Sequence, residues 1–187
     1  VSLTALIIGA QVTVENAEKL ALLFGISETV IGLTIIAVGT NAAFFDVESF
    51  SSVTVYWFNG SEWVLRGQPI FSEQRSALTT GVNVGISADG NRIVFAEPFH
   101  DQGIDSGTLA GPNLGIIRVF EWSGSDWNQL GSTLLGPQER SSLGYQLSFS
   151  ADGNTIAASE GFNRDIQTVV FRWDGQNWIQ LGPPINR

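Results

Sequence analysis

The pattern of apolar residues changes near residue 45, which divides the chain into two unequal parts. In the first part apolar residues recur at helical spacing, as at Val14, Ala17 and Ala21. Residues 29–45 then carry no charge, although this run is slightly shorter than the roughly 20 residues that a bilayer span needs. Periodicity alone therefore predicts an N-terminal helical hairpin, either buried in protein or inserted in a membrane.

Beyond residue 45 the sequence repeats. Residues 53–63 are matched by residues 117–127 and 168–178, and each of these segments ends in tryptophan and is followed four positions later by glycine. A second motif, Ser-Ala-Asp-Gly-Asn, occurs at residues 87–91 and 150–154. The closing tryptophans recur at intervals of about 50 to 65 residues, a period that is typical of propeller blades and other repeat arrays.

The first motif predicts a hairpin. Gly60-Ser61, Gly124-Ser125 and Gly175-Gln176 each fit a two-residue type II′ loop, because glycine adopts the positive φ of the first loop position at little cost. Counting outward places one aromatic pair across each hairpin: Phe58 with Trp63, Trp122 with Trp127, and Trp173 with Trp178. Such pairs stabilise a hairpin by roughly 0.2–1 kcal/mol each. We therefore expect Trp122, Trp127, Trp173 and Trp178 to pack in the core rather than to stack on sugars.

The second motif predicts another hairpin. Asp89-Gly90 and Asp152-Gly153 fit type I′ turns, which place Ile86 opposite Ile93 and Phe149 opposite Ile156. In sequence order each repeat would consist of a tryptophan hairpin and the Asp-Gly hairpin that follows it, four short antiparallel strands in all. Since one such sheet cannot bury both of its faces, the repeats must stack, and a radial stack of them is a β-propeller.

The predicted fold is therefore mainly β, an incomplete β-propeller of four-stranded antiparallel blades preceded by a transmembrane-like helical hairpin. The hairpin is assigned to residues 1–40, and the propeller to residues 41–187, with about two blades and the opening hairpin of a third. Closing the ring requires blades that this sequence does not supply. The first expected partners are thus the missing blades of a longer parent chain, and the absence of methionine also predicts a fragment.

Residues 46–187 resemble the propeller repeats of large surface or secreted proteins of algae and marine microbes, distant relatives of integrin-type and kelch-type blades. The resemblance rests on Val-Phe-x-Trp-x-Gly, Trp-x-Gln-Leu-Gly and Ser-Ala-Asp-Gly-Asn, each of which occurs twice. It implies a binding or scaffolding role toward a protein or glycan ligand of unknown identity. Integrin-type blades often carry an Asp-x-Asp-x-Asp-Gly calcium loop, whereas Ser-Ala-Asp-Gly has one aspartate, so we expect no calcium there.

Residues 9–40 resemble a different family, the second α-repeat of the calcium/cation antiporters of the sodium/calcium exchanger superfamily. From residue 25 to residue 40 the sequence follows the family pattern almost continuously. The resemblance implies attachment to a membrane through residues 1–45. It also implies Ca²⁺ or Na⁺ as transported ions, and no cofactor is predicted.

The family pattern continues Gly-Thr-Ser-Leu-Pro-Glu, in which the glutamate binds the ion inside the membrane. Here Thr40 and Asn41 match ligand positions, but Ala43 stands at the proline position and Phe44 at the glutamate position. Without a carboxylate, Thr40 and Asn41 are only weak metal-ligand candidates, because a divalent cation prefers charged oxygen ligands. The resemblance therefore predicts a segment that does not transport.

Two interpretations of the boundary stay open. Residues 34–40 also resemble the strand-forming residues 155–159, so exchanger-like and propeller-like sequences could be joined inside this shared string. This interpretation predicts a membrane protein whose propeller lies outside the bilayer. The extracellular side is one of the two sides on which it could lie. The rival treats the front as a degenerate first blade of a soluble or secreted propeller protein, since Phe24-Gly25 resembles Leu143-Gly144.

Composition narrows the range of partners. Nine basic and eighteen acidic residues give a net charge of -9, and such a surface repels phosphate, so nucleic acid is not an expected partner. The absence of cysteine excludes disulfides and thiolate metal sites within this sequence. Asn59 begins a formal glycosylation sequon, but its place in a tight hairpin loop favours a role in the turn.

Catalytic candidates are few. His100 is the single histidine, and it stands beside Asp101 and downstream of Ser87, but no nucleophile elbow supports a hydrolytic triad. We expect His100 to lie in a solvent-exposed loop. Glu97, Asp101 and Asp105 are likewise expected to form a solvated acidic run rather than a metal site. The chain is therefore not expected to be an enzyme.

Overall fold

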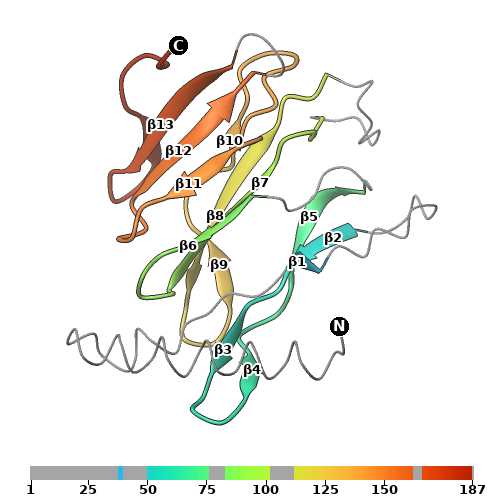
Figure 1. Ribbon diagram of the computed structural model, residues 1–187, viewed down its shortest axis with the longest axis vertical. Coiled ribbons are helices and arrows are strands. Elements are labelled where there is room, and N and C mark those ends of the chain that lie inside the picture. Colours follow the sequence, from blue (N-terminus) through green and yellow to red (C-terminus); the bar gives the residue numbers. More distant parts are fainter. Residues whose placement is uncertain (1–37, 40–49, 76–82, 102–111, 162–165, 187) are drawn as a thin grey trace, which may run out of the picture.

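The computed structural model describes residues 38–39, 50–75, 83–101, 112–161 and 166–186 (Figure 1). Every regular element in these ranges is a β-strand and every strand pair is antiparallel, so the prediction of a mainly β fold is confirmed. The predicted helical hairpin of residues 1–40 lies outside the described residues, with one exception. Val38–Gly39 form a strand, so the helical assignment is wrong at these two positions.

The strands form three units that follow one another along the chain. Unit 1 contains β1 (Val38–Gly39), β2 (Phe50–Val53), β3 (Tyr56–Phe58), β4 (Trp63–Leu65) and β5 (Ile70–Arg75). Unit 2 contains β6 (Val84–Ile86), β7 (Arg92–Glu97), β8 (Ile116–Trp122), β9 (Trp127–Gln129) and β10 (Leu134–Leu135). Unit 3 contains β11 (Leu147–Phe149), β12 (Thr155–Glu160), β13 (Gln167–Trp173) and β14 (Trp178–Gln180).

Units 2 and 3 share one strand order. In unit 2, β6, β7 and β8 lie side by side, and the outer edge of β8 pairs with β9 near one end and with β10 near the other. In unit 3 the order is β11-β12-β13-β14, and a bridge between Thr168 and Ile185 takes the place of β10. Each sheet thus joins an Asp-Gly hairpin to the tryptophan hairpin that follows it, rather than to the one that precedes it.

Unit 1 repeats the same registers. Val53 pairs with Ile70 at the position where Ile117 pairs with Leu134 in unit 2. Val38 pairs with Val53 in β1 and β2, as the corresponding residue Ala96 pairs with Ile117 in β7 and β8. Residues 38–39 therefore occupy a strand position of the repeat, as the similarity of residues 34–40 to residues 155–159 predicts.

The tryptophan hairpins have the predicted registers. Phe58 pairs with Trp63, Trp122 with Trp127 and Trp173 with Trp178. Their loop glycines, Gly60, Gly124 and Gly175, have φ of 100°, 100° and 104°. The side chain before the glycine closes each loop, as where Asn59 Oδ1 accepts the N–H groups of Ser61 and Glu62, both at 2.9 Å. The role of Asn59 in the turn is thereby confirmed.

The Asp-Gly hairpins have the predicted register but a different turn. Ile86 lies opposite Ile93 and Phe149 opposite Ile156. However, only the glycine has positive φ, which excludes type I′, and the Gly90 N–H donates to the Ser87 carbonyl at 2.9 Å. The turn therefore starts at the serine, and its last residue is a glycine with a left-handed backbone conformation. Because the Ser87 N–H still donates to the Arg92 carbonyl at 2.9 Å, the strands keep the register of the shorter loop.

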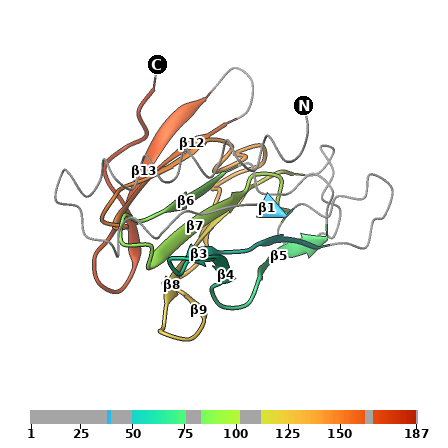
Figure 2. The same cartoon turned by 60° about the horizontal axis from the view of Figure 1, so that its bottom comes forward.

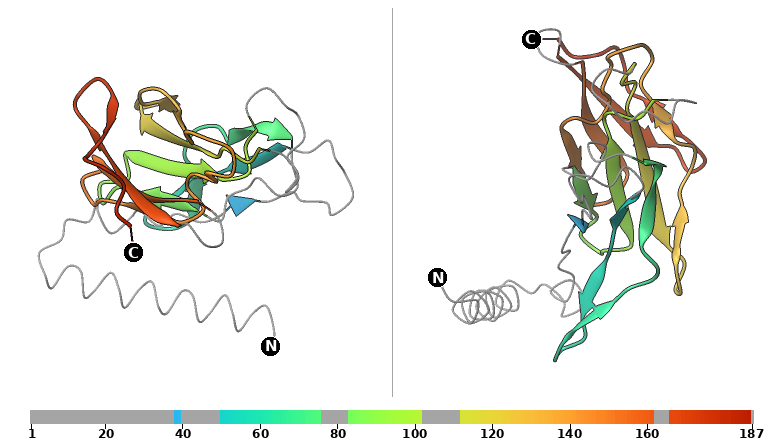
Figure 3. Two further views of the ribbon diagram at one scale, coloured as in Figure 1. Left: turned by 90° about the horizontal axis from the view of Figure 1, so that it is seen from above. Right: turned by 90° about the vertical axis from the view of Figure 1, so that its right-hand side faces the viewer.

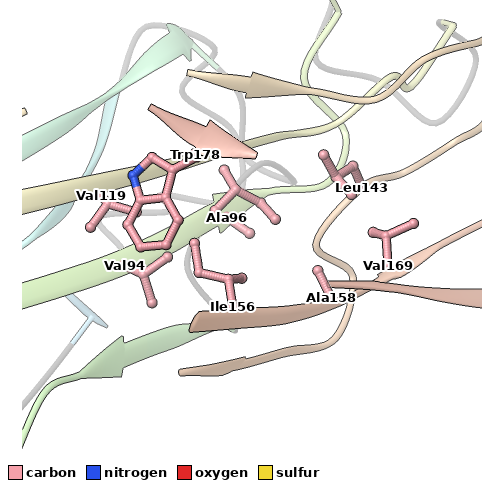
Figure 4. Close-up of a cluster of buried hydrophobic side chains, with 9 residues drawn as sticks. Val94, Ala96, Val119, Leu143, Ile156, Ala158, Val169 and Trp178 are labelled. Carbon is pink, nitrogen blue, oxygen red and sulfur yellow. The ribbon is translucent and has the colours of Figure 1, made fainter. Parts of the chain in front are cut away.

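The core consists of two apolar layers, each between successive units. Figure 2 and Figure 3 show that the units follow one another in space in chain order, with unit 2 between the other two. One layer joins Val53 and Val55 of unit 1 to Ile93 and Phe120 of unit 2. The other joins unit 2 to unit 3 and contains Val94, Ala96, Ile117, Val119, Leu143, Ile156, Ala158, Val169 and Trp178 (Figure 4). The sheet of unit 2 therefore buries one face against unit 1 and the other against unit 3.

Candidate functional site

Successive units are joined by a hydrogen bond from tryptophan to the backbone. The indole Nε1 of Trp127 in unit 2 donates to the carbonyl of Arg66 in unit 1 at 2.7 Å. The indole Nε1 of Trp178 in unit 3 donates to the carbonyl of Leu130 in unit 2 at 3.0 Å. Both indoles are more than nine-tenths buried, so the bond satisfies a donor that would otherwise be costly to bury. For Trp127 and Trp178 this confirms the expected packing in the core.

A glycine follows each acceptor, and the next unit covers it. A Cβ at Gly67 would lie 2.8 Å from the rings of both Trp122 and Trp127. A Cβ at Gly131 would lie 2.7 Å from the ring of Trp173. Both glycines have φ of 76°. We refer to this arrangement of carbonyl, glycine and covering aromatic pair as the joint.

A polar hollow of about 540 Å³ lies where the Asp-Gly turns of units 2 and 3 meet, and we refer to it as the groove. Asp89 and Asn91 line it from unit 2, and Asp152 and Asn154 line it from the same turn positions of unit 3. Arg92 crosses between the units, because its Nε donates to Glu121 at 2.9 Å and its Nη1 to Asn154 Oδ1 at 2.5 Å. Carboxylates, amides and one guanidinium can together hold a polar ligand by hydrogen bonds.

The two aspartates of the groove are held by their own turns. Burial on its own would raise the pKa of Asp89, but hydrogen bonds from Ser87 Oγ at 2.5 Å and the Asn91 N–H at 3.0 Å bring it below the ordinary value. The equivalent bonds from Ser150 and Asn154 lower the pKa of Asp152. Both carboxylates are therefore ionised at neutral pH and already accept bonds within the turn, which is the turn-forming role predicted for them.

A buried ionic cluster lies at the Glu97 end of β7, whereas the groove lies at the Arg92 end. Arg118 Nη2 donates to Glu97 Oε1 at 2.6 Å and to the Phe71 carbonyl at 2.8 Å. Glu97 Oε2 accepts the N–H of Glu73 at 3.2 Å. The Arg118 guanidinium also lies 4.6 Å from the centroid of the Phe95 ring. Arg118 and Glu97 are 6% and 1% exposed, so the pair ties β5 of unit 1 to β7 and β8 of unit 2 away from water.

His100 belongs to this cluster rather than to an exposed loop. Its N–H bonds back to the Glu97 carbonyl at 3.1 Å, which folds the residue over the ion pair. His100 is 7% exposed, and its Nδ1 lies 3.9 Å from Glu97 Oε2 without a hydrogen-bond partner among the described residues. Burial lowers the pKa of His100, and burial raises the pKa of Glu97 although Arg118 opposes that shift. The cluster thus favours a neutral imidazole.

The expectation that His100, Glu97 and Asp101 are solvated is therefore wrong. Glu97 and Asp101 are buried, and the Asp101 carboxylate accepts the N–H of Asn113. The reason is long-range, since the chain turns immediately after β7 and is held by residues 113–115, where the Gly115 N–H donates to the His100 carbonyl at 3.1 Å. Asp105 lies outside the described residues.

The structure separates the members of the conceivable triad. Ser87 precedes β7 and pairs with its first residue, whereas His100 and Asp101 follow its end. Six residues of strand put more than about 15 Å between them. Within the described ranges no three His, Asp or Glu side chains are grouped so as to hold a metal ion. Thr40 and Asn41, the weak metal-ligand candidates, lie outside the described residues.

Two arginines with structural roles were not singled out from the sequence. Arg118 stands between Ile117 and Val119 in the apolar first half of β8, and Arg92 begins β7 directly after a turn. A charge inside an apolar strand is a recognisable signal, because a charge is buried only with a partner. The partner of Arg118 comes from another strand, so the signal identifies the arginine but not the pair.

Comparison with known families gives a match to the N-terminal part of the chain. The family model for the sodium/calcium exchanger protein matches residues 1–62. The match covers less than half of the chain, and it extends past residue 40 across β2 and β3 of unit 1. No curated protein matches the chain. In the part of the chain that the structure describes, there is no helix with the length and apolarity needed to cross a membrane.

Proposed function

We propose that this chain is a membrane-associated protein in which an exchanger-type segment, residues 1–40, carries a β-propeller module that binds a protein or glycan ligand. The match to the exchanger family over residues 1–62 supports membrane association. The observation that carries the module is the joint, which occurs twice with the same geometry. A contact that repeats between successive antiparallel sheets is the way a propeller is assembled, and it gives a rigid scaffold.

The groove is the proposed ligand site of the module. It lies between two units, where equivalent turns present aspartate and asparagine from both sides. Its residues offer hydrogen bonds and charge but no nucleophile and base in contact, which favours binding over catalysis. The test is binding to an array of glycans. Asn91→Ala and Glu121→Ala should reduce the signal at least about tenfold, whereas Gln176→Ala in an exposed loop of unit 3 should not; unchanged binding by both groove variants would exclude this site.

The exchanger-type segment is proposed to be inactive in transport. Phe44 stands where the family pattern has its glutamate, and Thr40 and Asn41 provide only neutral oxygens. A Ca²⁺ ion held by neutral oxygens alone would be bound weakly. Vesicles that contain the full chain should therefore show no uptake of radioactive calcium above protein-free vesicles. Uptake that is lost on replacing Thr40 with valine would contradict the proposal.

A second candidate function is that of a soluble or secreted β-propeller binding protein with a degenerate first blade. It is favoured by β1, because Val38 pairs with Val53 in the register of an ordinary repeat. Membrane binding separates the two candidates. In flotation with phosphatidylcholine vesicles, the membrane-associated form should rise with the lipid, and Ile31→Asp in the uncharged run should weaken flotation. Ile179→Asp is the control, since Ile179 is an exposed apolar residue of unit 3. A wild-type chain that stays with the soluble fraction would favour the second candidate.

A further inference from the structure

The joint has two halves, and the two end units each expose one of them. The donor half is the aromatic pair of a hairpin, and the acceptor half is the carbonyl and glycine that follow the hairpin of the preceding unit. In the two internal joints, the acceptor halves of units 1 and 2 are covered by the buried donor halves of units 2 and 3. The donor half of unit 1 and the acceptor half of unit 3 are not covered in this way.

The donor half of unit 1 has the geometry of the other two. Phe58 and Trp63 lie 5.4 Å apart at 53° between ring planes, against 5.2 Å and 59° for Trp122 and Trp127. Trp63 is nevertheless 37% exposed, whereas Trp127 is 7% exposed. The hairpin is thus formed and the indole is accessible, which is the state expected of a joint without its acceptor.

The acceptor half of unit 3 is also preformed. The Leu181 N–H donates to the Val170 carbonyl at 2.7 Å, as the Leu130 N–H donates to the Val119 carbonyl at 2.8 Å. Gly182 has φ of 69°, close to the 76° of Gly131. A Cβ at Gly182 would meet nothing within 4 Å, whereas one at Gly131 would strike the next aromatic pair. The place for an aromatic pair is open.

The apolar surface around Gly182 agrees with this. Leu181 is 43% exposed, whereas Leu130 at the same position of unit 2 packs against the apolar layer that unit 3 completes. Ile179 and Ile185 of unit 3 are exposed as well. This face is the equivalent of the one through which unit 2 buries Ile117 and Val119.

We propose that two copies of this chain associate head to tail, with the Phe58–Trp63 hairpin of one copy on the Leu181–Gly182 site of the other. In this contact the Trp63 indole N–H donates to the Leu181 carbonyl, and its ring covers Gly182. The occupant is argued from continuity with the two internal joints, because one chain presents both complementary halves in the conformation that the joint uses. The interface is heterologous, so each copy keeps one free half after pairing. The proposal does not depend on membrane association.

Sedimentation velocity of the full chain in a mild detergent tests the proposal, since the detergent suppresses association through apolar segments. Mass should rise with concentration up to on the order of 100 μM. Gly182→Asn fills the acceptor site with a residue that tolerates positive φ, and it should weaken association at least about tenfold. Gly175→Asn is the matched control, because Gly175 also has positive φ and an open surrounding, and it should associate like wild type.

Mixing two variants tests the head-to-tail geometry. Trp63→Ser keeps the acceptor half and Gly182→Asn keeps the donor half, so each alone should be monomeric while their mixture forms a one-to-one dimer. Trp63→Phe keeps a ring against Phe58 and removes the N–H, so weak association by this variant would support the hydrogen bond even if Trp63→Ser fails to fold. A wild-type chain that stays monomeric, or a Gly182→Asn variant that associates like wild type, would overturn the proposal.

Discussion

Replacing Gly131 with alanine should weaken the joint between units 2 and 3. The new Cβ would lie 2.7 Å from Trp173 Cζ3 and 3.0 Å from Trp178 Cδ1, which is closer than packed carbon atoms approach. Trp178 cannot retreat freely, because its indole N–H is bonded to the Leu130 carbonyl at 3.0 Å. Overpacking of this kind costs about 1–3 kcal/mol. The left-handed backbone at φ of 76° adds roughly 1–2 kcal/mol for any residue with a Cβ.

Gly182→Ala provides the control that separates the two costs. Gly182 occupies the same position in unit 3 at φ of 69°, and a Cβ there has open space. Urea unfolding at low protein concentration should therefore show a loss of about 1–2 kcal/mol for Gly182→Ala and a further loss of about 1–3 kcal/mol for Gly131→Ala. Equal losses in the two variants would mean that the aromatic pair does not press on Gly131, and the steric account of the joint would fail.

Two predictions concern the buried ionic cluster. Arg118→Met should lower the free energy of unfolding in urea by about 3–5 kcal/mol, because Glu97 is left buried without its cation. Adding Glu97→Gln to this variant should recover part of the lost free energy. No recovery would contradict the charge argument. Burial lowers the pKa of His100 from its ordinary 6.5, so the unfolded chain takes up a proton more readily and stability should fall as the pH drops below 6.5. His100→Gln should lack that part of the decline in thermal melting between about pH 7 and pH 5.5, and identical declines would refute it.

The hairpin registers could be predicted from the sequence because they depend on residues close together in the chain. Loop glycines fix the positions from which the strands are counted, and the Ile86–Ile93 pair follows from such counting. The turn type could not be predicted as reliably, since Ser-Ala-Asp-Gly fits two turns of the same register. The serine decides between them, because Ser87 Oγ accepts the Arg92 N–H at 2.9 Å and donates to Asp89 at 2.5 Å.

The ionic cluster could not be predicted because its members meet through distant pairings. Arg118 contacts Glu97 across β7 and β8, and it contacts the Phe71 carbonyl from unit 1. His100 is followed by a glycine-rich acidic stretch that reads as an exposed connection. Its burial depends on contacts with Glu97 and with Gly115, and the second lies beyond that stretch in the sequence. Only one part of the joint could be predicted from the sequence. The glycine after each tryptophan hairpin recurs, but the ring that covers it belongs to the next unit.

The strand at Val38–Gly39 limits how the N-terminal segment can meet a membrane. Val38 pairs with Val53, and unit 1 buries Val53 at 3% exposure against unit 2, so β1 is part of a packed sheet. A residue held in that sheet cannot also lie within a bilayer. The uncharged run available to the membrane is then residues 29–37 rather than 29–45, well short of the roughly 20 residues of a helical span. If the chain is membrane-associated as proposed, the contact must therefore draw on the apolar residues upstream of Glu15 as well, and flotation should depend on residues 3–10 as strongly as on Ile31.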